Sequence, residues 1–193
     1  MTLILVRLFD FMASLLGIVM LSPLLMILFL IGVFDTGSPL FFQRRVGKRQ
    51  KGFTLVKFRT MHIGTPSKGT HEVSIAQVTR FGQFLRRTKL DELPQLWNVL
   101  IGTMSLVGPR PCLFSQIQLI EEREKRNVFI NKPGITGLAQ TRNIDMSTPE
   151  LLALTDAEMI QKWSIKSYFN YIIMTLAGKG QGDAINKGDA KEK

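Results

Sequence analysis

An acidic pair, Asp91–Glu92, lies in the most basic part of the chain. Residues 36–120 contain 13 lysines and arginines but only three carboxylates, and two of those three are this pair. Adjacent acids can cap a helix, and Asp91 is a good N-cap because Pro94 then falls in the first turn, where it removes no intrahelical donor. An ionised carboxylate beside a bound phosphate can also carry covalent phosphoryl chemistry. The pair therefore predicts a capped helix whose start faces an anionic substrate.

A divalent cation is expected at this pair. A carboxylate and a diphosphate repel each other, and Mg²⁺ held by Glu92, with Asp91 beside it and phosphate oxygens around it, would offset that repulsion. His62 and His71 are isolated in the sequence, and a single cysteine, Cys112, excludes an internal disulfide framework or a cysteine-rich metal site. The sequence therefore favours a magnesium site over a zinc site.

Basic side chains that can bind phosphate precede and follow the acidic pair. Arg110 lies between two prolines, and a guanidinium fixed in a stiff turn suits bidentate phosphate contact. Lys57 and Arg59 share one face of a predicted strand, and Arg86 belongs to a predicted helix that can lie along a membrane surface. The alternatives are a plain surface turn for Arg110 and a solvated strand face for Lys57 and Arg59.

An apolar segment precedes these groups and predicts a membrane helix. Residues Phe11–Phe34 are 24 uncharged residues bracketed by Asp10 and Asp35, more than the roughly 20 that cross a bilayer. Ser22-Pro23 interrupts the segment, because proline lacks a backbone donor. Either the helix spans the bilayer with a kink, or it is re-entrant, with Ser22 satisfying a freed carbonyl. Both flanks carry positive charge, so both can be cytoplasmic.

The remaining patterns predict a mostly α-helical fold with a small β-hairpin. Strands are expected at 41–46 and 53–59, helices at 75–87, 91–101, 113–130 and 149–177, and a turn-rich break at 132–137. The expected organisation is a membrane helix at 1–36, a compact catalytic domain at 37–177 and a tail at 178–193. The net charge of +10 indicates an anionic partner, which can be a membrane surface, a phosphorylated substrate or nucleic acid.

Three ordered blocks of sequence resemble the signature blocks of the bacterial sugar transferases, the small monotopic phosphoglycosyl transferases. The blocks are LDELPQLWNVL at 90–100, MSLVGPRP at 104–111 and PGITGLAQ at 133–140. The KFRTM run at 57–61 and the Ser22-Pro23 pair are also similar to that family. The likeness runs from about residue 1 to residue 140.

The resemblance implies a fold, a cellular location and a reaction. The first helix would be re-entrant, bent at Ser22-Pro23, with the catalytic domain and its amphipathic helices on the cytoplasmic face of the bacterial inner membrane. Asp91 would attack the β-phosphate of a UDP-sugar, release UMP and hold the phosphosugar until polyprenyl (undecaprenyl) phosphate accepts it. Glu92 would bind Mg²⁺. The product would be the first membrane-bound intermediate of a bacterial glycoconjugate.

Other details are implied by the resemblance or left open by the sequence. An N-acetylated amino sugar is the expected sugar, nucleic acid is not an expected partner, and a homodimer stays open. Many members of that family carry a Val-Asn-Gly-Arg-Asn run after the third block, where this chain reads TRNID at 141–145. The resemblance assigns Arg142 to the nucleotide. Two rival hypotheses are a non-catalytic membrane-surface adaptor and a metal-dependent phosphatase that uses water as its acceptor.

Overall fold

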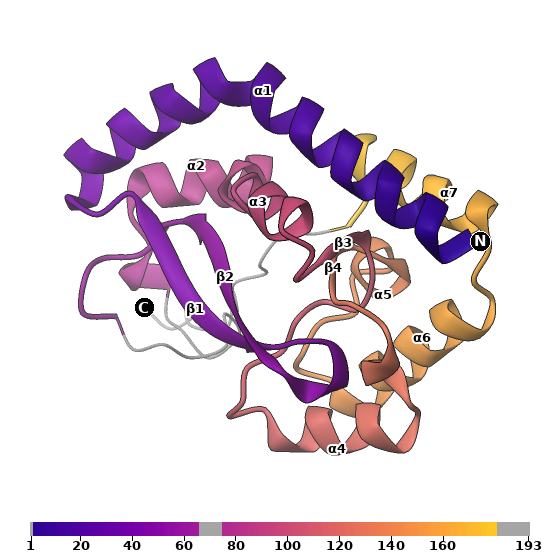
Figure 1. The fold of residues 1–193 in the computed structure, drawn as a ribbon. Coiled ribbons are helices and arrows are strands. Elements are labelled where there is room, and N and C mark those ends of the chain that lie inside the picture. Colours follow the sequence, from indigo (N-terminus) through magenta and orange to yellow (C-terminus); the bar gives the residue numbers. More distant parts are fainter. Residues whose placement is uncertain (1, 66–74, 181–193) are drawn as a thin grey trace.

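The computed structural model describes residues 2–65 and 75–180, and the expectations for His71 and for most of the tail lie outside them. The fold is mostly helical with a small antiparallel hairpin, as the sequence predicts (Figure 1). The helices are α1 (Thr2–Thr36), α2 (Arg80–Thr88), α3 (Gln95–Leu100), α4 (Ile117–Lys125), α5 (Leu138–Thr141), α6 (Pro149–Gln161) and α7 (Ile165–Leu176). The strands are β1 (Leu40–Val46), β2 (Gly52–Phe58), β3 (Ser105–Val107) and β4 (Gly134–Thr136).

Helix α1 is continuous through Ser22-Pro23 and forms an arch over α2 and α3 (Figure 1). Pro23 cannot donate to the carbonyl of Val19, four residues earlier. The hydroxyl of Ser22 donates to that same carbonyl at 2.8 Å. Ser22 thus supplies a donor to the carbonyl that Pro23 leaves free, and the interruption is a bend within one helix rather than a gap between two. This helix, from Ile4 to Thr36, is long and apolar enough to cross a membrane, and most of its surface is exposed.

The hairpin and two short helices form the frame beneath the arch. Strands β1 and β2 pair from Leu40 opposite Phe58 to Val46 opposite Gly52, in agreement with the predicted hairpin. The helix predicted from residue 75 begins only at Arg80. Thr79 is its N-cap, because its hydroxyl accepts from the backbone N–H of Gly82 at 2.8 Å.

Three other boundaries were wrong in the sequence prediction. The helix expected at 113–130 ends at Lys125 and is followed by a short 3-10 turn, η5 (Val128–Ile130). The helix expected at 149–177 is divided into α6 and α7, because Ser164 and Ser167 form a capping box that starts a new helix. The turn-rich break at 132–137 contains β4, which pairs in parallel with β3.

The β3–β4 pair depends on two glycines at a close backbone crossing. A Cβ added to Gly134 would lie 2.0 Å from the backbone nitrogen of Gly108, closer than two such atoms can approach. Neither glycine needs an unusual φ here, so lack of space alone excludes a side chain. Short-range periodicity does not reveal this pair, because its strands are three residues long and almost thirty residues apart.

Replacing Gly134 with alanine tests this crossing. We expect Gly134→Ala to lower the free energy of unfolding by about 1–3 kcal/mol, the usual cost of overpacking. Chemical unfolding in detergent, followed by intrinsic fluorescence, measures the change. Gly17→Ala is the control, because an added Cβ there meets only the side-chain end of Leu96, at 3.2 Å, and Gly17 lies inside a helix. An unchanged midpoint for Gly134→Ala would contradict the crossing.

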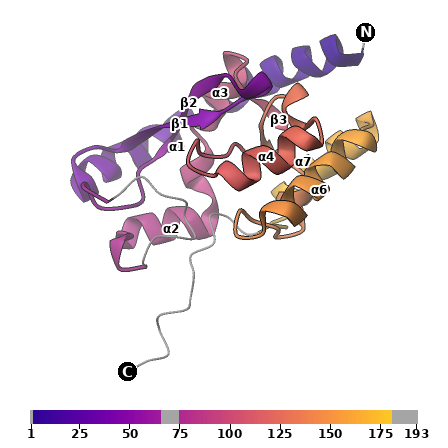
Figure 2. The same ribbon diagram turned by 90° about the horizontal axis from the view of Figure 1, so that it is seen from below.

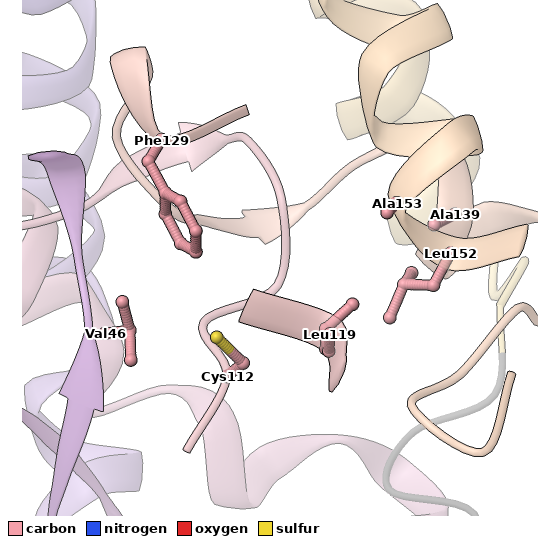
Figure 3. Close-up of a cluster of buried hydrophobic side chains, with 7 residues drawn as sticks. All are labelled: Val46, Cys112, Leu119, Phe129, Ala139, Leu152 and Ala153. Atoms are coloured by element: carbon pink, nitrogen blue, oxygen red, sulfur yellow. The ribbon is translucent and has the colours of Figure 1, made fainter. Parts of the chain in front are cut away.

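The main hydrophobic cluster joins the hairpin to the C-terminal helices (Figure 3). Its buried members are Val46, Cys112, Leu119, Phe129, Ala139, Leu152 and Ala153. Figure 2 shows α4, α6 and α7 together on one side of the molecule. Two smaller clusters lie under α3 and between α1, β2 and α2. The core therefore connects the elements that carry the acidic pair to those that carry Arg110.

Candidate active site

The acidic pair lies in a tight turn between α2 and α3. Lys89 ends α2 in the left-handed conformation, with φ of 59°, and the chain continues into a 3-10 turn, η4 (Leu90–Glu92). The turn packs against α2 and β2. Asp91 is 2% exposed, and the side chain of Glu92 is 11% exposed. The fold thus shields both acids from water, Asp91 more completely than Glu92.

The prediction that Asp91 is an N-cap was wrong. Helix α3 begins at Gln95, with Pro94 at its N-cap position, and no side chain caps either η4 or α3. The left-handed Lys89 ends α2, and the 3-10 turn η4 begins directly after it. Asp91 therefore lies inside a helical turn instead of preceding one. The field of a helix start therefore does not explain this aspartate. The charges that surround it must come from neighbouring side chains.

Glu92 forms an ion pair with Arg110, which the sequence placed 18 residues away. The guanidinium Nη2 donates to Glu92 Oε1 at 2.6 Å, and both side chains are largely shielded from water. Lys89 shares this environment. Burial lowers the pKa of Lys89, Glu92 opposes that shift, and Arg110 adds to it. The turn after β3 therefore brings a phosphate-binding type of side chain directly to the acidic pair.

A buried ion pair holds the backbone of Arg110. Arg123 of α4 donates to the Arg110 carbonyl at 2.8 Å and to Asp156 Oδ2 of α6 at 2.6 and 3.0 Å. The side chains of Arg123 and Asp156 are 2% and 0% exposed. Sequence reasoning missed both, because a charged residue in a charged helix gives no sign of burial. Their effect is to fix the carbonyl beside the Arg110 side chain.

Three further predicted phosphate ligands lie near η4, but two have structural partners. Lys57 is buried and lies 5.9 Å from the ring centre of Phe41. Arg59 donates to the carbonyls of Ser38 and Leu40, which ties the end of α1 to the hairpin. Lys57 is on β2, which packs against η4, and Arg59 directly follows that strand. Arg59 therefore connects the residues that follow α1 to the hairpin.

Arg86 differs from Arg59 because part of its guanidinium has no partner. It is 6% exposed, and its Nε donates to the hydroxyl of Thr60 at 2.9 Å. Among the described residues, its buried Nη1 has no hydrogen-bond partner. A buried guanidinium nitrogen without an acceptor is costly, so an anionic ligand would supply a missing contact.

Arg142 has a partner other than the acidic pair. Its Nη1 lies 2.9 Å from Glu158 Oε2 of α6, and its side chain is half-exposed. Its role at a nucleotide stays a prediction. The segment after α7 comes closer to the pair, since Lys89 Nζ donates to the carbonyl of Lys179 at 2.9 Å. The end of the described chain therefore lies beside the turn that carries Asp91.

Both arms of α1 are anchored to the rest of the chain. Near the start, Arg7 donates to the carbonyls of Val99 and Leu100 at 2.6 and 2.7 Å, which are the last carbonyls of α3. Near the end, Asp35 accepts from the hydroxyl of Thr79 at 2.7 Å. The α1 arch thus contacts the helices on both sides of the acidic pair.

Asp10 is the second anchor near the start of α1. It is 2% exposed and accepts from Ser105 Oγ at 2.8 Å, from the backbone N–H of Leu106 at 3.1 Å and from the hydroxyl of Tyr168. Burial and this carboxylate raise the pKa of Tyr168. Sequence reasoning took Asp10 for the boundary of the apolar run and left open whether the aromatic residues near Tyr168 are core; Tyr168 is core.

Comparison with known proteins places this chain in a family. The sequence model described as bacterial sugar transferase matches residues 1–179. An uncharacterised sugar transferase, EpsL of Bacillus subtilis, is 39% identical over 90% of this chain and 86% of its own length. A UDP-glucose:undecaprenyl-phosphate glucose-1-phosphate transferase of Caulobacter vibrioides is 36% identical over 88% of this chain and 67% of its own length.

Some relatives are much longer than this chain. The UDP-galactose-lipid carrier transferase of Erwinia amylovora is 36% identical over 88% of this chain, but only 39% of that protein is covered. The shared part includes the turn with the acidic pair, the Arg110 turn and α1, since the family match begins at residue 1. The chain therefore belongs to the bacterial sugar transferase family.

Proposed function

We propose that this chain transfers a sugar-1-phosphate from a UDP-sugar to undecaprenyl phosphate through a covalent intermediate on Asp91. The observation that carries the proposal is the geometry of the turn: a buried aspartate next to a glutamate that is 2.6 Å from Arg110. The named activities of the Caulobacter relative and of a Xanthomonas campestris relative are of this kind. The proposed reaction would be the first membrane step in the assembly of a polysaccharide or another glycoconjugate.

The chemistry proceeds in two displacements. In the first, an Asp91 carboxylate oxygen attacks the β-phosphorus, the bond from that phosphorus to the bridging oxygen breaks, and UMP leaves with the electron pair. In the second, an oxygen of undecaprenyl phosphate attacks the same phosphorus, and the carboxylate leaves unchanged. Two easier steps replace one difficult step, as is general for covalent catalysis. The products are UMP and an undecaprenyl-diphosphate sugar.

Cationic side chains stabilise the phosphates in this proposal. Arg110 is already fixed by Glu92 and by the Arg123 contact to its carbonyl, so little ordering is left to do on binding. Arg86 offers the buried Nη1 that has no partner in the described part of the chain. Lys57 adds a buried positive charge on the adjacent strand. Arg142 stays assigned to the nucleotide by resemblance alone.

The donor set at the turn fits Mg²⁺. In residues 2–65 and 75–180 no group of three or more His, Cys, Asp or Glu is placed to hold a metal. Two carboxylates that are completed by phosphate oxygens and water are the ligands Mg²⁺ prefers. Glu92 and Asp91 would hold the ion, which would neutralise charge on the diphosphate. Glu92 keeps one carboxylate oxygen beyond the one that accepts from Arg110.

We also infer that α1 is re-entrant and that both of its ends face the cytoplasm. A helix that crosses the bilayer has its ends on opposite sides, about 30 Å apart. Here Arg7 and Asp10 bind one part of the catalytic domain and Asp35 binds another. The bend at Pro23 and the exposed apolar surface between these anchors support the same topology. The domain would then sit on the inner membrane at its cytoplasmic face.

The identity of the sugar is proposed from the resemblance to the family. We keep an N-acetylated amino sugar as the candidate from resemblance, with glucose and galactose as the alternatives that relatives' names indicate. UMP release from a panel of UDP-sugars separates them. The same assay in reconstituted protein of known oligomeric state tests the homodimer.

A trap-and-chase experiment tests the reaction itself. The purified chain in nanodiscs is mixed with UDP-sugar labelled in the sugar, and label bound to protein is measured after denaturation. We expect label on Asp91, lost on adding undecaprenyl phosphate and recovered in lipid. Label recovered only as free sugar phosphate would assign the phosphatase reaction instead. Absence of both protein-bound label and UMP, with salt-sensitive binding unaffected by replacing the acidic pair, would favour the adaptor hypothesis.

A further inference from the structure

A cavity of about 350 Å³ lies at the start of α1, and Pro109 is among the residues that line it, whereas Arg110 is not. Its wall combines three cationic residues, Arg7, Lys48 and Lys132, with apolar residues that include Ile130 and Trp163. Neither Asp91 nor Glu92 lines it. A ligand in this cavity would therefore be bound without taking part in the reaction.

Three cationic groups converge on a wall that contains a single carboxylate, that of Asp10. A Cβ added to Gly102 would lie 3.0 Å from Arg7 Nη2 and 3.5 Å from Lys132 Nζ, so these two positive groups approach the same point. Burial lowers the pKa of Lys132, and Arg7 and Lys48 add to that shift while Asp10 opposes it. Like charges held this close destabilise the empty cavity and favour an anion.

The one acidic residue that lines the cavity, Asp10, already has hydrogen-bond donors. Asp10 accepts from Ser105, Leu106 and Tyr168, so its carboxylate serves the anchor described above. Arg7 donates to two carbonyls of α3 but keeps its charge. Within residues 2–65 and 75–180, no acidic side chain forms an ion pair with Lys48 or Lys132. The two lysines therefore have donors to offer to a ligand.

The exposed apolar residues of the wall, Ile130 and Trp163, form the mouth of the cavity. Ile130 is 57% exposed and Trp163 is 38% exposed. Helices α1 and α7 share an aromatic contact, Phe9 to Phe169, with ring centres 4.9 Å apart. Val6, Arg7 and Asp10 of α1 also line the cavity, so in the proposed topology this mouth would lie near the lipid headgroups. A ligand with both a negative group and an apolar chain matches these two parts of the wall.

We propose that this cavity binds the phosphodiester headgroup of an anionic membrane phospholipid, with Lys132 and Lys48 on the phosphate and Trp163 and Ile130 on the adjoining chain. A resident lipid would neutralise the lysines and hold the first arm of α1 against α3 and α7. The phosphate chemistry is shared by free phosphate and by lipid phosphomonoesters. The non-reacting position and the apolar mouth favour a bulk phospholipid over both.

Fluorescence of Trp163 tests the proposal in the full chain. The chain has two tryptophans, so a Trp97→Phe background leaves Trp163 as the reporter. In zwitterionic micelles we expect short-chain phosphatidylglycerol to change the emission saturably and phosphatidylcholine to leave it unchanged. Lys132→Gln should weaken the phosphatidylglycerol Kd about tenfold, the effect of losing one charged contact. Lys132→Arg should retain binding, and Lys166→Gln, an equal charge loss on exposed α7 surface, should not change it.

Four results would overturn the proposal. Equal binding of phosphatidylcholine would remove the anion requirement, and equal binding of inorganic phosphate would remove the lipid. Tighter binding of farnesyl phosphate than of phosphatidylglycerol would assign the cavity to a lipid phosphomonoester. Equal weakening by Lys132→Gln and Lys166→Gln would indicate diffuse attraction. Because UMP release is not measured, these outcomes are separate from the success or failure of the proposed transferase.

Discussion

Asp91→Asn is expected to abolish UMP release from the UDP-sugar that the unchanged chain uses best. An amide oxygen is a poor nucleophile, so the first displacement would not occur. The loss should be a factor on the order of a thousand or more, as for removal of other covalent nucleophiles. The substitution keeps the size of the side chain and removes its charge. UMP release is measured with saturating UDP-sugar in nanodiscs that contain undecaprenyl phosphate.

The control for this prediction is Asp145→Asn, which removes one negative charge elsewhere. Asp145 accepts from the backbone N–H of Ser147 at 2.9 Å in an exposed loop, so its replacement should leave UMP release close to the original rate. Glu92→Gln should retain the covalent intermediate but form it slowly, because the Arg110 contact and the proposed metal ligand are weakened. Rapid UMP release by Asp91→Asn would show that another group is the nucleophile.

Asp156→Asn is expected to cause the largest loss of stability. The substitution leaves Arg123 buried and charged without its carboxylate, and breaking one partner of a buried ion pair costs about 3–5 kcal/mol. Urea unfolding in detergent, followed by intrinsic fluorescence, measures the loss. Glu158→Gln is the matched control. It removes an acid from the same helix, but the ion pairs it breaks are exposed to water, so we expect no clear change.

A double replacement separates the stability of this ion pair from its effect on the site. Arg123→Met with Asp156→Leu removes both buried charges and should recover much of the stability that the single change loses. It also removes the donor to the Arg110 carbonyl, so UMP release should be lower than in the unchanged chain. Full recovery of both stability and activity would show that Arg123 does not position Arg110.

Local patterns in the sequence were sufficient for several elements. The β1–β2 hairpin follows from two alternating strands and a polar turn, and the long apolar run of α1 is apparent from composition alone. Ser22 was expected to satisfy a carbonyl at the bend, and it donates to Val19. The acidic pair was found because its charge contrasts with the basic residues around it. These features depend on neighbours within a few residues, which is the range over which periodicity and charge carry information.

The tertiary structure decided which distant groups meet. The β3–β4 pair, the Glu92–Arg110 contact and the Arg123–Asp156 pair each join residues 18 to about 33 positions apart. Asp91 lies inside a turn because Lys89 adopts a left-handed conformation, which the presence of a lysine in the sequence does not predict. Asp10 is an anchor because Ser105 and Tyr168 pack against it. The sequence determined the chemistry at residues 91 and 92, whereas burial and long-range packing decided which charges surround them.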